Sequence, residues 1–273
     1  MKRFSRYPIT SEVLAWIFGL LIIIPLLIVL LNSLKDRAGA NLMTLSLPKT
    51  FHWNNYLIVI KEGRLLQSFF NSLLISTASV FISTLFSSLA SFIISRRKSK
   101  FNRGIYYYFL VGLIAPLNMV TVIKTLQVFH LMNSYSGIIL LYSSLLIPFS
   151  IFLYAGFINT VPQELDEAAI IDGCGPGRLF FNVVFPLLKP VTMTVVVINF
   201  MNSWNDFITP LYLLNSSEKW TMTLAIYNFY GQRISDWQLV FADIVLTVLP
   251  VLFIYMLGQR YIISGMTAGA VKG

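Results

Sequence analysis

The chain has 273 residues, of which 56% are hydrophobic and only 11% are charged, and its formal net charge is +9 at pH 7. Soluble domains carry about 25% charged residues, so this composition excludes a water-soluble enzyme as well as a disordered or fibrous chain. The remaining class is an integral membrane protein. We attribute the positive charge to membrane topology and the acidic inner leaflet, and expect no binding of nucleic acid.

Long stretches without charge predict the membrane-spanning segments. A spanning helix needs about 20 mostly apolar residues, and a charge at mid-bilayer costs about 2.5–3.5 kcal/mol. The pattern predicts an all-α membrane protein with six transmembrane helices, over residues 13–34, 70–95, 105–129, 137–158, 190–213 and 239–261. The first apolar run is longer than the core of a cleaved signal peptide, about 7–15 residues, so we expect it to remain as a helix.

Basic residues predict the orientation in the membrane. Five of them follow the second predicted helix, at Arg96, Arg97, Lys98, Lys100 and Arg103. Such a compact positive segment resists translocation. We therefore expect it on the cytoplasmic side of the cell (inner) membrane, and with it both the N-terminus and the C-terminus of a multi-pass protein.

Polar features inside the predicted helices carry weaker signals. Serines recur every four residues on one face of the second helix, at Ser79, Ser83, Ser87, Ser91 and Ser95. Small hydroxyl residues favour a tight helix–helix contact, with a polar pore stripe as the alternative. Prolines interrupt the predicted helices and predict kinks there, at Pro25, Pro116, Pro148, Pro210 and Pro250.

Three charged residues lie in or near the predicted spans, at Lys124, Asp206 and Asp243. The predicted topology places all three near the external surface, where the lysine could pair with either aspartate. Intramembrane charges are functional candidates, but side chains that reach the interface from helix ends explain them equally well. We retain both interpretations of this candidate outer charge cluster.

The sequence contains no residue pattern typical of a catalytic site or a metal site. Cys174 is the single cysteine, and the two histidines, His52 and His130, are isolated from each other and from other ligand types. The glycines at 173, 175 and 177 are not followed by the Lys-Ser/Thr pair of a phosphate-binding loop. We therefore expect no catalytic, cofactor-binding or metal site in this chain.

The connection between the fourth and fifth predicted helices, residues 161–190, is long and contains acidic residues. Pro162 and the acidic first turn favour a short helix outside the bilayer, and Gly173 can end it. Leu165, Ala168, Ala169 and Asp172 follow helical spacing and predict a shallow face, on which the two alanines could enter a groove of another protein beside Glu167.

This segment resembles the signature of permease subunits of ABC importers, in which Glu-Ala-Ala is followed by Gly and then by Ile-x-Leu-Pro. Here the residues are Glu167-Ala168-Ala169, Gly173 and Val183-x-Phe185-Pro186, with Val183 and Phe185 replacing Ile and Leu. The segments 51–60, 71–76, 201–211 and 264–273 resemble the second, shorter permease of maltose-type sugar importers (MalG-like), although Asp206 stands where a glutamate is usual.

The resemblance implies a type I importer fold and a division of the chain into three parts. Residues 1–68 would contain the first helix and first external loop, 69–263 the permease core, and 264–273 a cytoplasmic tail. A short coupling helix between helices four and five would dock on an ATPase. Its residues would be Glu167, Ala168, Ala169, Asp172 and Gly173.

The resemblance also implies the function and the partners. The chain would form half of the path for a sugar or oligosaccharide, together with a second permease, an ATPase dimer that binds ATP and Mg²⁺, and an extracytoplasmic solute-binding protein. Asn118, Asn202 and Asn205 could bind sugar hydroxyls, or could bond to neighbouring helices. An ABC permease for another small organic solute is the alternative, followed by an ion-coupled secondary transporter.

Overall fold

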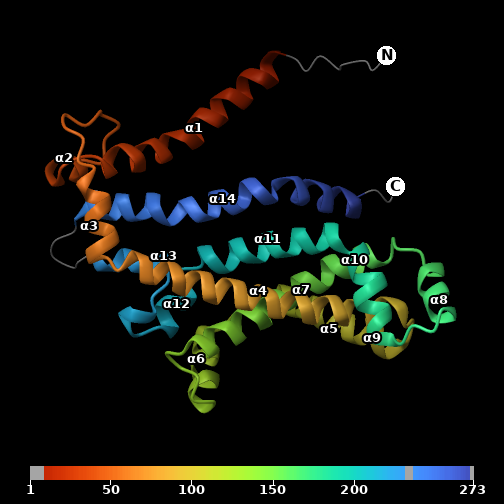
Figure 1. The fold of residues 1–273 in the computed structure, drawn as a ribbon. Coiled ribbons are helices and arrows are strands. Elements are labelled where there is room, and N and C mark those ends of the chain that lie inside the picture. Colours follow the sequence, from red (N-terminus) through yellow and green to blue (C-terminus); the bar gives the residue numbers. More distant parts are fainter. Residues whose placement is uncertain (1–8, 231–235, 271–273) are drawn as a thin grey trace. The chain divides into compact units, whose positions relative to one another are not determined.

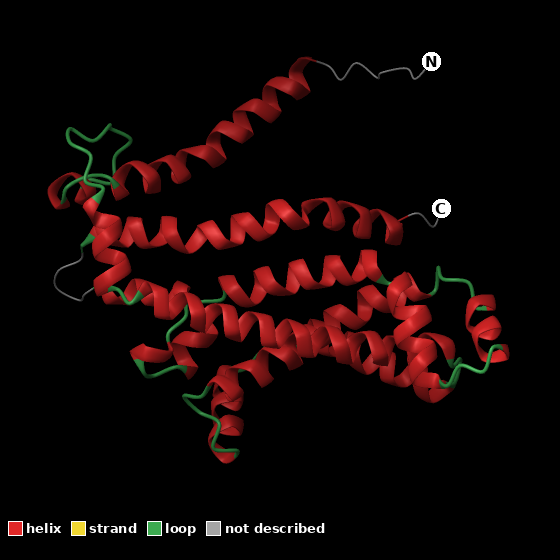
Figure 2. Ribbon diagram, in the orientation of Figure 1, coloured by secondary structure: helices red, strands yellow, loops and turns green. Residues whose placement is uncertain are grey.

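The structure is a computed structural model in which residues 9–230 and 236–270 are described, with the side chains of 11–230 and 236–259. The described residues form helices joined by loops (Figures 1 and 2). Among the described residues, four helices are long and apolar enough to cross a membrane, and the number rises to six if each of two bent helix pairs is one span. The predicted all-α membrane fold is confirmed.

The four long helices are α1 (Ile9–Ser33), α4 (Leu65–Arg96), α7 (Tyr135–Ile158) and α14 (Trp237–Ala270). In the first bent pair, α5 (Lys100–Ile114) meets α6 (Met119–Val128) at 115°. In the second, the helical segment Pro176–Leu187 meets α11 (Lys189–Asn205) at 78°.

The shorter helical elements connect these helices. They are α2 (Arg37–Asn41), α3 (Asn54–Glu62), α8 (Glu164–Ile171), α9 (Pro176–Arg178), a π-helical turn (Leu179–Val184), α10 (Phe185–Leu187), α12 (Ile208–Leu213), α13 (Met222–Ala225) and two 3₁₀ turns (Ser217–Lys219 and Ile226–Asn228).

The predicted span over 105–129 consists of two helices, α5 and α6, that meet at Pro116, where the sequence predicts a kink. The chain leaves the helical conformation at Ala115, whose backbone is extended, because a residue before proline is driven out of the helical region. Helix α6 starts again after Asn118, whose side chain accepts a hydrogen bond from the Thr121 amide at 3.1 Å. Pro116 therefore breaks the span, whereas Pro25 and Pro148 lie inside continuous helices.

Two other predicted helices also differ from the helices in the structure. The predicted helix 190–213 is interrupted at Asp206, whose backbone is extended and whose carboxylate accepts from the amides of Ile208 and Thr209, the start of α12. Helix α14 continues to Ala270, beyond the predicted end at residue 261. The side-chain cap at Asp206 supplies the local reason for the first difference.

The chain divides into two compact units. One consists of the residues up to Leu66 together with Ala225–Leu249, and the other of Gln67–Leu224 together with the residues from Pro250 onward.

In the first unit, polar contacts fold the loop after α1 against the end of that helix. The Lys35 ammonium is buried and donates to Asn32 Oδ1 and to the Thr44 carbonyl, each at 2.9 Å. The Asn55 amide donates to the carbonyls of Ser33 and Lys35. Burial lowers the pKa of Lys35 from its usual value of 10.5. The long first loop is thus an ordered part of this unit.

In the second unit, the serine face of α4 packs against α7. Four serines of the series are fully buried: Ser79, Ser83, Ser87 and Ser91. The Ser79 hydroxyl donates to the carbonyl of Ile139 at 3.3 Å, and the Ser91 hydroxyl donates to that of Ile151 at 3.4 Å. Small side chains let the two backbones approach, as expected at membrane helix contacts. The serine series therefore forms a helix–helix seam.

The second unit has two distinct ends (Figure 1). Helix α8 lies at one end, near the C-terminus of α4 and the beginning of α5, whereas α6 and α12 lie at the other. A buried apolar cluster that includes Ile75, Tyr142 and Leu213 fills the α6–α12 end. A second cluster, which includes Ile158, Ala169 and Phe180, fills the end that carries α8. The second cluster positions the candidate site.

Candidate functional site

Helix α8 forms where the sequence predicts a short helix outside the bilayer. Its first turn contains Glu164, Asp166 and Glu167, whose negative charges favour a helix N-terminus. Gly173 follows the helix with a φ of +81°, a conformation that suits glycine. The Cys174 amide then donates to the Ala169 carbonyl at 2.9 Å, closing the helix as a glycine-ended helix typically closes. The predicted end of the helix at Gly173 is confirmed.

One side of α8 is buried against the rest of the second unit. Asp166 and Ala169 are each 8% exposed, and Ala169 packs in the cluster that contains Ile158, Leu179 and Phe180. The predicted free face through Leu165, Ala168, Ala169 and Asp172 is therefore wrong with respect to Ala169. Helical spacing alone does not reveal which face a second element covers, and here the segment after α8 covers this one.

The opposite side of α8 is open. Its exposed residues include a stripe at positions i, i+3, i+4 and i+7, which is one face of a helix: Glu164, Glu167, Ala168 and Ile171. Ile171 is 85% exposed, an unusual environment for a large apolar side chain outside the bilayer. The surface combines two carboxylates, a small residue and an exposed isoleucine, which suits contact with another protein.

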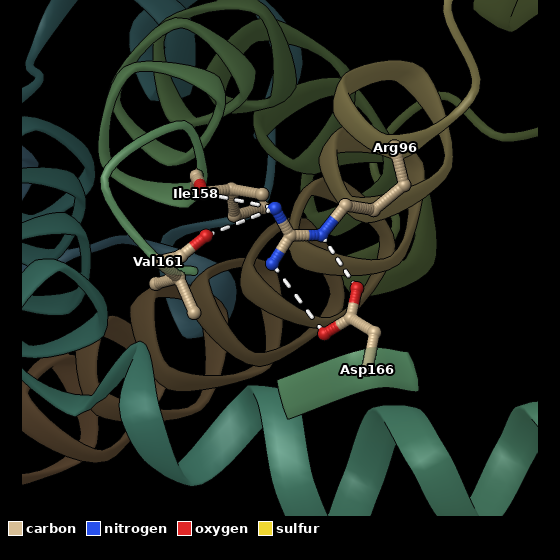
Figure 3. Close-up of polar contacts among 4 residues, drawn as sticks. All are labelled: Arg96, Ile158, Val161 and Asp166. Atoms are coloured by element: carbon tan, nitrogen blue, oxygen red, sulfur yellow. Dashed lines mark hydrogen bonds and ion pairs between the residues drawn. The ribbon is translucent and has the colours of Figure 1, made fainter. Parts of the chain in front are cut away.

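An ion pair fixes α8 to the end of α4 (Figure 3). Arg96 Nε lies 2.7 Å from Asp166 Oδ2, and each side chain is only 12% exposed. Arg96 Nη1 also donates to the Val161 carbonyl at 3.1 Å, with a longer contact of 3.5 Å to the Ile158 carbonyl. One guanidinium therefore joins the end of α4, the last residue of α7 with the turn that follows it, and α8.

The segment that follows α8 contributes aromatic side chains to the apolar cluster on which α8 packs. Phe180 is 2% exposed, and its ring lies 5.5 Å from that of Phe92 in α4 and 5.7 Å from that of Phe185. Val183 and Phe185 pack against the same cluster. The two residues that depart from the signature thus keep an apolar packing role. Helix α8 sits on a closely packed layer.

Lys124 and Asp206, the two candidate outer charges of the second unit, form no ion pair with each other. Asp206 is bound by its own turn and by the Tyr142 hydroxyl, which donates to Oδ2 at 3.0 Å. Lys124 is exposed on α6 and forms no ion pair with the described residues. Asp243 is buried and belongs to the other unit. The sequence leaves open which aspartate Lys124 could pair with; in the structure, a tyrosine from α7 and backbone amides of α12 bind the Asp206 carboxylate.

The three candidate asparagines have different environments. The Asn118 side chain caps the N-terminus of α6 by accepting a hydrogen bond from the Thr121 amide. Asn202 and Asn205 are exposed near the C-terminal end of α11 and have no hydrogen-bond partner among the described residues. They lie three residues apart on one face of α11, so this helix presents a polar face outside the packed interior of the chain.

Sequence reasoning missed the roles of Arg96 and Asp166. Arg96 is one of five basic residues in its segment, and Asp166 is one of four acidic residues in the loop. The available signal was the position of Arg96 at the last turn of a predicted helix, where a cation favours helix carbonyls. The position of Arg96 in the sequence does not indicate which of the four acidic residues pairs with it.

Comparison with known proteins agrees with this architecture. Residues 83–268 match the family described as binding-protein-dependent transport system inner membrane component. The chain is 35% identical to a probable starch degradation products transport system permease of Thermoanaerobacterium thermosulfurigenes, over 94% of both chains. It is 33% identical to a melibiose/raffinose/stachyose import permease of Bacillus subtilis (strain 168), over 92% of this chain and 91% of that one.

A solved structure shares the fold. It is the crystal structure of a bacterial ABC transporter involved in the import of the acidic polysaccharide alginate, and one of its chains matches with a TM-score of 0.83 at 20% identity. The match covers 96% of this chain and 99% of that chain. The protein therefore belongs to the family of binding-protein-dependent transport system inner membrane components, as a multi-pass permease subunit of the ABC importer type.

Proposed function

We propose that this chain is the permease subunit of an ATP-driven, binding-protein-dependent importer for a sugar or oligosaccharide. It forms half of the translocation path beside a second permease subunit. Energy enters through α8 from a dimer of ATPase subunits, which bind ATP and Mg²⁺, because this chain carries no phosphate-binding loop of its own. An extracytoplasmic solute-binding protein delivers the sugar.

The exposed face of α8 is the observation that carries this proposal. Glu167 and Ala168 lie on that face, and Asp166 on the opposite face is held by Arg96. One side of α8 is free to contact a docked subunit, and the other side is joined to α4 and α7. A movement of the docked subunit would therefore displace α8 and, through it, α4 and α7. Small displacements pass through packed interfaces because those interfaces deform little.

The orientation follows from the charges at the α8 end. The basic residues from Arg96 to Arg103 lie at the end of α4 and the start of α5, the same end of the second unit as α8 (Figure 1). Positive segments remain on the cytoplasmic side. We therefore place α8, the N-terminus and the C-terminus in the cytoplasm, where an ATPase would reach them.

The polar face of α11 supports a path for a hydroxyl-rich solute. Asn202 and Asn205 are exposed without partners in the described part of the chain, and unpaired amides are costly against lipid. We place them toward a water-filled cavity shared with the second permease. Several relatives are named for sugar transport, including the two above. Closure of the ATPase dimer would then open this cavity alternately to either side.

A pull-down of the tagged chain from detergent-solubilised membranes tests the proposal. We expect an ATPase and a second multi-helix membrane protein to co-purify with the wild type. Glu167→Lys reverses a charge on the exposed face of α8 and should lose the ATPase while the second permease stays bound. Glu62→Lys makes the same change at an exposed residue of α3 and should keep both partners.

Sugar uptake and ATP hydrolysis in vesicles complete the test. The Glu167→Lys variant should insert normally and lose sugar-dependent ATP hydrolysis, whereas Glu62→Lys should match the wild type. Normal uptake by the α8 variant would contradict the coupling role. Recovery of the chain as a stable homo-oligomer without any ATPase would contradict the importer proposal as a whole.

A further inference from the structure

A cavity of about 630 Å³ lies at the α8 end of the second unit, between the C-terminal ends of α4 and α7 and the first half of α5. Its volume is in the range of ligand pockets, about 300–1,000 Å³. Four cationic side chains line it: Arg97, Lys98, Lys100 and Arg103. The coupling mechanism proposed above makes no use of this cavity.

The charge of the cavity is uncompensated. No aspartate or glutamate is among its lining residues, and none of the four cations forms an ion pair with any residue that the structure describes. Arg96, the neighbour of Arg97, is already paired with Asp166 and does not line the cavity. Four like charges around one cavity repel each other at low ionic strength, so an anion is the ligand they favour.

The turn that presents these cations is held in place by hydrogen bonds. The buried Asn102 amide donates to the Arg97 carbonyl at 2.8 Å. The Ser99 hydroxyl accepts from the Asn102 backbone amide at 3.0 Å and caps α5. The four cations are therefore attached to an ordered backbone, which distinguishes this cavity from a loose charged loop.

Aromatic residues indicate that the cavity lies at the depth of lipid headgroups. Tyr106 lines it, and the next two residues of α5, Tyr107 and Tyr108, are 57% and 74% exposed. Phe101 in the first turn is 74% exposed. Exposed aromatic residues gather at the membrane–water interface, where one part of the ring is in hydrocarbon and the other reaches water.

The geometry points to a binding site for the phosphate headgroup of an anionic phospholipid in this cavity. Arginine and lysine bind phosphate oxygens through charge-assisted hydrogen bonds, and Ser99 and Asn159 offer neutral polar groups to a glycerol headgroup. Basic pockets between membrane helices on the cytoplasmic side bind such lipids. The acyl chains would leave along the exposed apolar surface of α5.

A free phosphate compound shares this chemistry, but the position favours the lipid. The exposed aromatic residues beside the cavity need an apolar neighbour, which acyl chains supply and a soluble anion does not. The inference rests on the membrane placement in the proposed function. It is independent of the sugar and of the ATPase, so lipid binding by the purified chain can fail or succeed separately from transport.

Two variants separate the charge of the cavity from its shape. Lys98→Gln/Lys100→Gln removes two charges and changes the size of the two side chains only modestly. Gly156→Leu keeps every charge and fills space, because Gly156 lines the cavity and no atom lies within 4 Å of a Cβ built there. Lys49→Gln/Lys61→Gln, at exposed residues of the first unit, is the matched control for net charge.

Binding is measured by native mass spectrometry of the purified chain, titrated with phosphatidylglycerol or phosphatidylcholine. We expect the wild type to prefer phosphatidylglycerol, and the control to equal it. Each basic residue near an anionic surface contributes about a fivefold gain in affinity, so the Lys98→Gln/Lys100→Gln variant should bind phosphatidylglycerol about 25-fold more weakly. Gly156→Leu should weaken it as well.

Four outcomes would overturn the inference. An equal loss of lipid binding in the control variant would show that only the net charge of the chain matters. Undiminished binding by Gly156→Leu would show that the lipid binds to a charged surface and does not enter the cavity. Displacement of the lipid by an equal concentration of inorganic phosphate would assign the cavity to a soluble anion. Loss of co-purified ATPase in the Lys98→Gln/Lys100→Gln variant, with unchanged lipid binding, would assign it to a protein contact.

Discussion

Arg96 shows how one side chain can decide the geometry of the coupling site. Its guanidinium contacts the Asp166 carboxylate and carbonyls at the end of α7. Both charged groups are largely out of water, so each depends on the other to offset the loss of hydration. The net contribution of the intact pair to the stability of the fold is small. Removal of either partner is costly, because it leaves the other charge buried without a counter-charge.

Asp166→Asn is expected to destabilise the protein and displace α8. The change leaves Arg96 without its counter-charge, and removal of one partner from a buried pair costs about 3–5 kcal/mol. Thermal unfolding in detergent should show a clearly lower midpoint. Asp172→Asn, at an exposed residue that follows α8, should stay within about 0.5 kcal/mol of the wild type.

The charge-swapped double variant, Arg96→Asp with Asp166→Arg, tests whether the pair itself positions α8. Partial recovery of thermal stability and of ATPase co-purification is expected, because opposite charges again face each other. If Asp166→Asn unfolds at the wild-type temperature and couples normally, the ion pair has no positioning role.

At the scale of the helices, close backbone contacts hold the second unit together. The serine seam brings α4 against α7, and Gly258 of α14 contacts α11. A Cβ built at Gly258 would lie 2.5 Å from Val197 Cγ2, closer than side-chain atoms approach one another. Between membrane helices, association depends on such packing because lipid tails are as apolar as leucine.

Replacement of a seam serine by a larger residue should separate α4 from α7. Ser91 is fully buried, and overpacking a close contact costs about 1–3 kcal/mol. The Ser91→Leu variant should therefore unfold at a lower temperature, as measured by the fraction that remains monodisperse after heating in detergent. Phe81→Leu changes an exposed residue of the same helix and should have little effect; an equally mild Ser91→Leu would disprove the seam.

Gly258→Ala should also destabilise the protein, and its effect should depend on Val197. The added methyl group meets the valine side chain, with an expected cost of about 1–3 kcal/mol. The double variant with Val197→Ala should recover much of the stability in the same heating assay. Gly19→Ala is the control, because nothing lies within 4 Å of a Cβ at that residue; a Gly258→Ala effect that Val197→Ala does not relieve would contradict this contact.

At the scale of the whole molecule, two surfaces indicate that the chain works within a larger assembly. The exposed face of α8 and the polar face of α11 lie open. These surfaces are consistent with the proposed pairing with a second permease, which would cover part of the exposed area.

Asn202→Leu and Asn205→Leu should weaken uptake without affecting assembly. Each lost hydrogen bond to a neutral hydroxyl is worth about 0.5–1.5 kcal/mol, which corresponds to a loss of about 2- to 13-fold in apparent affinity for the sugar. Uptake of radiolabelled sugar into vesicles measures this, and co-purified ATPase should stay constant. The same change at exposed Gln67 in the first turn of α4 should have no effect; unchanged uptake in both asparagine variants would exclude this face from the path.

The sequence by itself determined the features that depend on composition and local chemistry. The charge-free runs predicted a membrane protein, the serine period predicted the seam, and Gly173 predicted the end of α8. Each of these follows from a property of neighbouring residues along one helix. The family signature, too, lies within one continuous segment.

Only the tertiary structure decided which polar groups meet. It paired Arg96 with Asp166, buried Ala169, satisfied Asp206 with Tyr142 and surrounded one cavity with four cations. In a membrane protein the apolar pattern does not separate a lipid-facing side chain from one that packs against a helix, because both environments are equally apolar. The partner of a polar group, and therefore its function, depends on contacts between residues distant in the sequence.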